Sequence, residues 1–243
     1  MKADKHRPKD GTRETNELTL RPIAICHSPF SSKFGIPRQS GLVSEVHAEL
    51  VFLPEFRQPD ALRGIEQYTH LWLLWGFSEV KKESWSATVR PPRLGGNERL
   101  GVFATRSPFR PNPIGLSSVR LLSVEADAAR GAVLHIAGAD LMDGTPIYDI
   151  KPYLPYVDCH AEAMGGFSDE HKADALQVNI PDEWLQRLPQ EHHAAVHALL
   201  CGDPRPSYHN DEERVYGFPY AGYDIRFTVR DGVATVVEIV PLD

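Results

Sequence analysis

The feature that most constrains the fold of this chain is a series of short apolar stretches, separated by proline- and glycine-rich turns, between residues 18 and 160. The stretches alternate apolar and polar residues or are apolar throughout, as β-strands are. Alternating strand–helix units are absent, which argues against a doubly wound sheet. Short strands at close spacing are typical of a small closed or nearly closed β-barrel, so we predict a mainly β fold class. The predicted strands are 18–28, 43–52, 70–77, 101–105, 115–125, 132–137 and 149–152.

The character of the sequence changes near residue 160. Residues 161–174 are small, polar and acidic, as in a linker or loop. Residues 182–200 predict a helix, which Pro189 should break or kink because proline lacks the backbone donor. Two alternating stretches, 220–229 and 233–240, meet at an Asp-Gly pair, a strong hairpin signal. The sequence therefore predicts a flexible tail (1–17), a barrel domain (18–160) and a small α+β C-terminal lobe (161–243).

Composition narrows the class of protein. The 243 residues are 42% hydrophobic, enough to bury a core, and this excludes global disorder. The longest apolar run, 71–77, is far shorter than the roughly 20 residues of a membrane helix. Three isolated cysteines form no CxxC pair, which argues against disulfides and a zinc finger and fits a reducing compartment. The polar N-terminus has no signal-peptide core. We therefore expect a cytoplasmic protein with no membrane partner.

Charge is unevenly distributed along the chain. The net charge of −7, taken alone, disfavours a nucleic-acid partner. Residues 81–120, however, hold eight basic and two acidic residues, a local charge of +6, whereas residues 160–215 hold eleven acidic and four basic residues, a local charge of −7. Because phosphate binding depends on local basic patches, the basic segment means that the negative net charge does not exclude a nucleic-acid partner.

Two common kinds of site are not expected. GxGxxG and P-loop motifs are absent, so a Rossmann cofactor site is unfavoured. His193 and His197 are spaced i,i+4 and would share one helix face, but no HExxH or carboxylate pattern accompanies them. We favour a solvated helix with histidines over metal ligation and predict no metal site.

The segment RSPFRPNPIGLS (106–117) has more proline than a simple turn between strands requires. Its three prolines fix the backbone and hold Arg106 and Arg110 on a rigid loop. Rigidly held arginines are typical of a binding site for a carboxylate or a phosphate.

Three further segments carry candidate site residues. Residues 140–156 combine a tight Asp-Gly turn with Asp, Lys and Tyr side chains between prolines, a pattern that favours a ligand rim over a plain capped strand. The loop 33–41 offers exposed backbone amides and Arg38. The turn 203–208 offers Arg205 and Tyr208, which could stack on bases or form an ordinary surface pair, and this alternative stays open.

Taken together, RPPRLGG (90–96), RSPFRPNPIGLS (106–117), DGTPIYDIKPYLPY (143–156), FGIPRQSG (34–41) and DPRPSY (203–208) resemble the TsaA/VirR-like family, in its two-lobed TrmO-type form. The resemblance runs from about residue 20 to the C-terminus. It implies a non-Rossmann β-barrel methyltransferase that uses S-adenosylmethionine (SAM) and works as a homodimer with the cofactor near the subunit interface. The implied reaction is N6-methylation of N6-threonylcarbamoyladenosine at position 37, in the anticodon loop of tRNA.

The resemblance also implies roles for individual residues. The cofactor would be bound by Pro37, Arg38, Gln39, His70, Leu71, Arg106, Leu116, Leu141, Met142, Asp143 and Gly144. Because the N6 nitrogen is amide-like and must lose its proton, a base should lie near it, and the unranked candidates are Asp143, Tyr148 and Asp149. Candidates for contacts with the tRNA or its threonyl carboxylate are Arg90, Arg93, Arg110, Lys151, Arg205 and Tyr208.

Two other functions fit the same residues. One is a non-catalytic module that binds a small anion or SAM. The other is a methyltransferase that acts on a metabolite. The basic segment 81–120 favours a nucleic acid over a metabolite.

Overall fold

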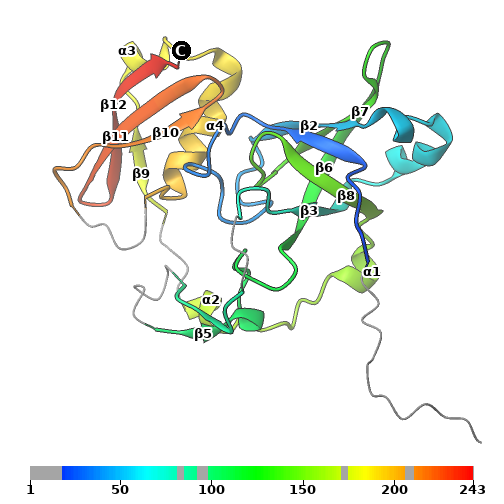
Figure 1. Ribbon diagram of the computed structural model, residues 1–243. Helices are drawn as coiled ribbons and strands as arrows, with labels where there is room; N and C mark the ends of the chain where they lie inside the picture. The colour runs from blue at the N-terminus through cyan, green and yellow to red at the C-terminus, as the bar shows by residue number, and fades with distance from the viewer. Residues whose placement is uncertain (1–17, 81–84, 92–97, 171–174, 206–210, 243) are drawn as a thin grey trace, which may run out of the picture.

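The computed structural model describes residues 18–80, 85–91, 98–170, 175–205 and 211–242 (Figure 1). Six antiparallel strands within these ranges form a closed barrel in the order β1-β2-β7-β6-β3-β8, which confirms the predicted fold class. The barrel strands are β1 (Ala24–His27), β2 (His47–Phe52), β3 (His70–Gly76), β6 (Ile114–Asp127), β7 (Gly131–Ala137) and β8 (Thr145–Pro152).

The barrel encloses an apolar core. Strand β1 pairs with both β2 and β8 and thereby closes the ring. Alternate residues point inward, and the side chains of Leu50, Leu73 and Ile147 are fully buried. Between β2 and β3, three 3-10 turns follow one another, and Leu62 and Ile65 pack against the barrel core. These turns are η1 (Pro54–Phe56), η2 (Pro59–Leu62) and η3 (Ile65–Gln67).

The C-terminal part of the chain forms a second sheet with helices, beside the barrel in Figure 1. The hairpin predicted at the Asp-Gly pair is confirmed by the antiparallel pairing of β11 with β12. The helical segment predicted for 182–200 is present, and the break predicted at Pro189 is confirmed: the segment forms two helices, and Pro189 occupies the N-cap of the second. The elements are β9 (Gln177–Asn179), α3 (Asp182–Leu185), α4 (Gln190–Cys201), β10 (Tyr216–Tyr220), β11 (Tyr223–Arg230) and β12 (Val233–Pro241).

The strand predicted for 101–105 is also wrong in most of its length. Only β5 (Leu100–Gly101) is extended, and it pairs with β4 (Thr88–Val89). The next residues form the 3-10 turn η5 (Val102–Ala104), because the amide and hydroxyl of Thr105 both donate to the Val102 carbonyl, at 3.2 and 2.9 Å. Two further short helices are α1 (Pro155–Asp158) and α2 (Phe167–Glu170).

The loop between β1 and β2 joins the two sheets. Phe30, Val43 and Val46 belong to the same hydrophobic core as residues of β10, β11 and β12. The amide of Ala221, in the turn between β10 and β11, donates to the Pro29 carbonyl at 2.8 Å. The loop that carries the predicted cofactor residues is therefore packed on the C-terminal sheet as well as on the barrel.

Candidate functional site

Three predicted site segments meet at one end of the barrel. The amide of Gly41 donates to the carbonyl of Gly138 at 2.8 Å, which joins the 33–41 loop to the segment that follows β7. The hydroxyl of Ser28 donates to the Leu141 carbonyl at 2.7 Å, and the Ser118 amide of β6 donates to the Ser40 hydroxyl at 3.1 Å. Residues far apart in the sequence thus form one contiguous surface.

The 33–41 loop requires glycine where it crosses the C-terminal sheet. Gly35 has φ of +84°, a left-handed conformation that side chains other than glycine rarely adopt. A Cβ on Gly35 would lie 2.4 Å from Cδ2 of Phe218. The backbone therefore touches the Phe218 ring directly, which fixes the position of the residues that follow, Pro37 to Gln39.

Side-chain hydrogen bonds connect this loop to both of its neighbours. Arg106, from the proline-rich segment, donates through Nη1 to Oε1 of Gln39. Gln39 donates through Nε2 to the carbonyl of Arg38. The Nη2 atom of Arg38 donates to the carbonyls of Asp203 and Arg205, at 3.1 and 3.4 Å. Arg38 therefore bridges the loop to the C-terminal lobe.

A partly buried polar chain lies next to Arg106. Trp75 Nε1 donates to the Ser117 hydroxyl at 2.9 Å, and that hydroxyl donates to Oδ1 of Asp140 at 2.6 Å. Burial raises the pKa of Asp140, while the Ser117 hydrogen bond and the charge of Arg106 oppose this shift. A carboxyl group with a raised pKa beside an arginine, in a cluster of polar groups, marks a candidate functional position.

The Asp-Gly turn at 143–144 presents a half-exposed carboxylate. Oδ1 of Asp143 lies 3.3 Å from Nδ1 of His27 and accepts the Ser28 amide at 3.2 Å. The amide of Asp143 donates to the Phe30 carbonyl in the loop after β1, and the amide of Gly144 donates to the Cys26 carbonyl of β1, at 2.9 Å each. The turn is thus held rigidly, with its carboxylate toward solvent.

The apolar residues predicted to bind the cofactor differ in how exposed they are. Leu116 is 55% exposed on the outer face of β6, where it can contact a ligand. Leu141 is buried in the barrel core, so it offers a ligand only its backbone. Pro37 and Met142 are partly buried, and the Met142 carbonyl accepts hydrogen bonds from Thr145.

His70 and Leu71 lie apart from this cluster within one chain. Leu71 is buried in the barrel core, whereas His70 is exposed at the start of β3, with Nδ1 3.0 Å from the Thr69 hydroxyl. In the register between β3 and β6, Leu74 is opposite Leu116 and His70 is four residues away. At about 3.3 Å per residue, this places His70 roughly 13 Å from Leu116 along the strands.

The three candidate catalytic residues also do not lie together: Tyr148 and Asp149 are on β8, away from Asp143. Tyr148 reaches across to Gly76 at the end of β3, where its hydroxyl fills the space that a Cβ would occupy. Asp149 pairs with Lys151, with Oδ2 and Nζ 2.9 Å apart. Asp149 is four residues along β8 from Thr145, about 13 Å from the Asp-Gly turn at the start of that strand.

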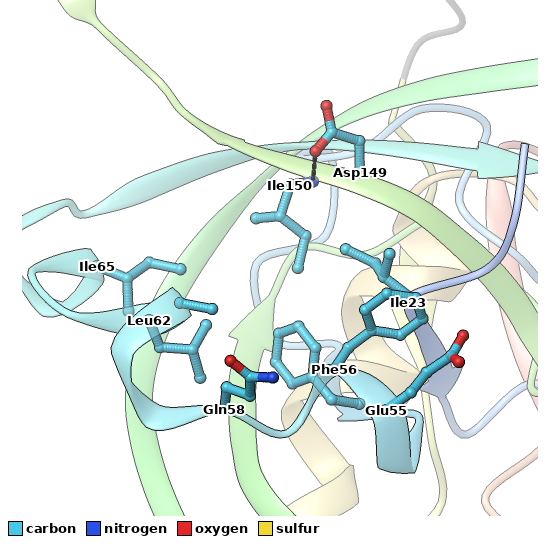
Figure 2. Close-up of a pocket in the computed structure, with 10 residues that line it drawn as sticks. Ile23, Glu55, Phe56, Gln58, Leu62, Ile65, Asp149 and Ile150 are labelled. Carbon is cyan, nitrogen blue, oxygen red and sulfur yellow. Dashed lines mark hydrogen bonds between the residues drawn. The ribbon is translucent and has the colours of Figure 1, made fainter.

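A pocket of about 490 Å³ lies beside Asp149. Figure 2 shows apolar side chains around it, with the Asp149 carboxylate pointing away from them and accepting the Ile150 amide at 3.0 Å. Its other lining residues are Ile23, Phe52, Glu55, Phe56, Gln58, Ala61, Leu62 and Ile65, from the segments that cover that part of the barrel. The pocket is therefore separate from the cluster around Arg106 and Asp143.

Of the residues predicted to contact tRNA, four are described. Arg90 is exposed just after β4, and Lys151 is exposed on β8. Arg110 donates through Nη1 to the Thr105 carbonyl of its own loop at 3.4 Å. Arg205 is largely buried and pairs with Asp203. The remaining two, Arg93 and Tyr208, lie outside the described residues.

Across the described ranges, His, Cys, Asp and Glu side chains form no group of three that could hold a metal ion. His193, one of the histidines considered above, has Nε2 2.8 Å from the Leu188 carbonyl. No helix in the described part of the chain is long and apolar enough to cross a membrane.

Sequence reasoning assigned no role to Trp75, or to His27 and Ser28 beside the Asp-Gly turn. Asp140 and Ser117 lie at the ends of the candidate segments 140–156 and 106–117, but neither was singled out. Trp75 reads as an ordinary strand residue, and only the pairing of β3 with β6 brings it to Ser117.

Comparisons with known proteins cover both parts of the chain. The family model for the tRNA-methyltransferase O N-terminal domain matches residues 25–159, and the model for the TrmO C-terminal domain matches residues 173–242. A tRNA (adenine(37)-N6)-methyltransferase of Escherichia coli is 38% identical over 234 residues, which is 93% of this chain and 99% of that protein. A Pseudomonas aeruginosa protein named as a putative S-adenosylmethionine-dependent methyltransferase is 42% identical over 221 residues, 86% of this chain and 91% of its own length.

Solved structures show the same similarity in three dimensions. A crystal structure of TrmO from P. aeruginosa superimposes with a TM-score of 0.77 at 34% identity, covering 94% of this chain and 99% of that one. Both the barrel and the C-terminal lobe are therefore present in a solved relative.

Proposed function

This chain belongs to the tRNA-methyltransferase O family, and from that premise we propose that it transfers a methyl group from SAM to N6 of adenosine 37 in tRNA. We further propose that the substrate adenosine carries a threonylcarbamoyl group on N6. Because tRNA is the proposed substrate, the protein would work in the cytoplasm.

The observation that carries the proposal is the convergence of three motif segments at one end of the barrel. Arg106 bonds to Gln39, the 138–141 segment bonds to the loop at Gly41, and Asp143 stands on the adjoining turn. Gln39, Arg106 and Asp143 are among the residues that the family resemblance assigns to the cofactor, and Gly41 and Gly138 adjoin such residues. Together these segments form one surface.

The donors and acceptors on this surface suit SAM. Its carboxylate requires a cation or N–H donors, which Arg106 and Gln39 offer. Its amino group and sulfonium are positive and favour a nearby carboxylate, such as Asp143 or Asp140. Its adenine requires an apolar surface, and the exposed Leu116 side chain supplies one. When bound, SAM supplies an electrophilic methyl group.

The chain's own residues would position the substrate and accept a proton. In-line transfer depends on orientation, which the rigid 106–117 and 138–144 segments can enforce. We propose Asp143 as the hydrogen-bond acceptor for the N6 proton, because it is exposed and oriented by His27 and Ser28. Lys151 and Arg110 remain candidates for the threonyl carboxylate, and the C-terminal lobe for the anticodon loop.

We propose that the active form is a homodimer. Three apolar side chains of β6 are exposed: Leu116 is 55%, Leu122 42% and Val124 38% exposed. A partner chain packed against this strand would cover part of that apolar surface and could bring its own His70 to the cofactor, since His70 of the same chain lies roughly 13 Å from Leu116 along the strands. Sedimentation analysis at micromolar concentration should show a dimer, and Leu122→Glu should shift it to a monomer.

The proposed activity is tested with SAM labelled in the methyl group and tRNA that carries or lacks threonylcarbamoyl. Label on the modified tRNA alone supports the full proposal. Label on both tRNAs supports the methyltransferase but not the requirement for threonylcarbamoyl. Cofactor binding without transfer would favour the non-catalytic module, and transfer to a small molecule alone would favour a metabolite methyltransferase.

A further inference from the structure

Arg38 connects the 33–41 loop to the C-terminal lobe. Because residues 37–39 of this loop are proposed to bind SAM, we call it the cofactor loop. Its guanidinium donates to two backbone carbonyls, those of Asp203 and Arg205, more than 160 residues away in the sequence. Because Gln39 adjoins Arg38 and bonds to Arg106, the position of Arg38 also affects the Gln39–Arg106 contact.

The two acceptor carbonyls belong to a turn whose conformation is stabilised by the side chains of Asp203 and Arg205. Arg205 forms a bidentate pair with Asp203, with Nε–Oδ1 and Nη2–Oδ2 distances of 2.8 and 2.9 Å. The Arg205 guanidinium also lies 5.9 Å from the centre of the Tyr216 ring. Asp203 has φ of +50°, a left-handed conformation that Asp and Asn tolerate better than most residues.

The Asp203–Arg205 pair is largely withdrawn from solvent. The Arg205 side chain is 13% exposed and that of Asp203 is 19% exposed. Two N–H donors of Arg205 are taken up by the carboxylate, and the hydrogen bonds raise the pKa of its guanidinium. A group held this way is better placed to maintain backbone geometry than to contact a phosphate.

We propose that Asp203 and Arg205 are positioning residues for the cofactor loop: their ion pair fixes the two carbonyls that hold Arg38, and thereby sets the SAM affinity of the 37–39 segment. This inference rests on the proposed function, because it assumes that the segment binds SAM. It gives the C-terminal lobe a role in cofactor binding that is independent of any contact with tRNA.

The test measures the Kd of SAM alone for the full chain by calorimetry, with KM for tRNA measured separately. Arg205→Ala should weaken SAM binding about tenfold, the order expected when a charge-assisted hydrogen-bond network is loosened. Asp203→Asn keeps the left-handed backbone and one acceptor, and should give a smaller loss. Arg226→Ala is the matched control: this arginine pairs with Asp224 and Glu238 in the same lobe, and its loss should leave the Kd unchanged.

A double-mutant cycle asks whether Arg205 acts through Arg38. If it does, Arg205→Ala should have no further effect on SAM affinity in a chain that already carries Arg38→Ala. Additive losses would overturn the inference, as would normal SAM affinity in Arg205→Ala with a raised KM for tRNA, since that result would make Arg205 a tRNA contact. Arg205→Lys keeps the charge but loses the bidentate geometry, so it should resemble Arg205→Ala if the two parallel hydrogen bonds, and not the charge alone, fix the turn. If the wild-type chain does not bind SAM at all, the proposed function fails and this inference with it.

Discussion

Replacing Gly35 by alanine should destabilise the protein through a specific collision between the 33–41 loop and the C-terminal sheet. A Cβ at this position would meet three atoms of the Phe218 side chain at 2.4, 2.7 and 2.9 Å. Phe218 is 2% exposed and packs edge-on against Phe227, so its ring has little room to move. The loop must therefore lift off the sheet, or the core must rearrange.

The expected cost has two parts. A left-handed backbone costs a residue other than glycine about 1–2 kcal/mol. Overpacking a buried ring adds about 1–3 kcal/mol. The free energy of unfolding should therefore fall by about 2–5 kcal/mol, a large part of the 5–15 kcal/mol typical of a folded domain.

The two parts can be separated with a second glycine, Gly222, in the turn between β10 and β11. Gly222 has a similar φ of +80°, but a Cβ there would meet no atom within 4 Å. Urea unfolding of Gly222→Ala should show only the backbone cost, and SAM affinity should fall in Gly35→Ala but not in Gly222→Ala. Equal destabilisation of the two variants at equal m-values would refute the argument that Gly35 is required by contact with Phe218.

Three other changes test separate features of the structure. Ser117→Ala removes the donor to the partly buried Asp140 carboxylate and should lower the free energy of unfolding by about 1–3 kcal/mol in urea titration; an unchanged midpoint would contradict that hydrogen bond. Burial raises the pKa of the Cys26 thiol to about 12, so a disulfide reagent at pH 8 should label the exposed Cys159 and leave Cys26 unmodified until the protein unfolds; equal labelling rates would contradict its burial. Backbone and side-chain hydrogen bonds lower the pKa of Asp127 to about 2. Its ionised form should therefore stabilise the fold above its unfolded pKa of about 4, and this stability should be lost as the pH falls toward 2. Asp127→Asn should flatten that acid limb of stability measured by urea titration, and superimposable limbs would refute the assignment.

The barrel could be predicted from the sequence because its strands carry a local signal. Alternation of apolar residues located five of the six barrel strands to within a few residues at one end or both, and the sixth, β8, in its second half. The sequence did not reveal β10, because Gly217 and Pro219 interrupt it with residues typical of turns, and only pairing with β11 makes it a strand. The prediction for 101–105 failed for the opposite reason. The sequence there is apolar enough for a strand, but no neighbouring strand continues the hydrogen-bonded pairing beyond Gly101.

The site was less accessible to prediction for a different reason. The motif segments can be found because their prolines, glycines and arginines are unusual. The contacts of Arg38 cannot, because its partners are backbone carbonyls, and every residue has one. Whether an arginine side chain is available to a ligand depends on the tertiary fold, and here the Arg205 side chain is held in an ion pair with Asp203.

The docking of the β1–β2 loop on the C-terminal sheet also bears on how the protein is made. A chain emerging from the ribosome exposes residues 28–46 long before the strands that will cover Phe30 and Val46 have been synthesised. The barrel itself needs β8 before β1 has its second neighbour, and Arg38 has no acceptor carbonyls until residue 205 has left the exit tunnel. The 33–41 loop is therefore among the last parts of the nascent protein to become ordered. We expect ribosome-released fragments that stop before β10 to lack an organised 33–41 loop even when their barrel is closed, so, if this loop binds SAM as proposed, truncated chains would not sequester SAM.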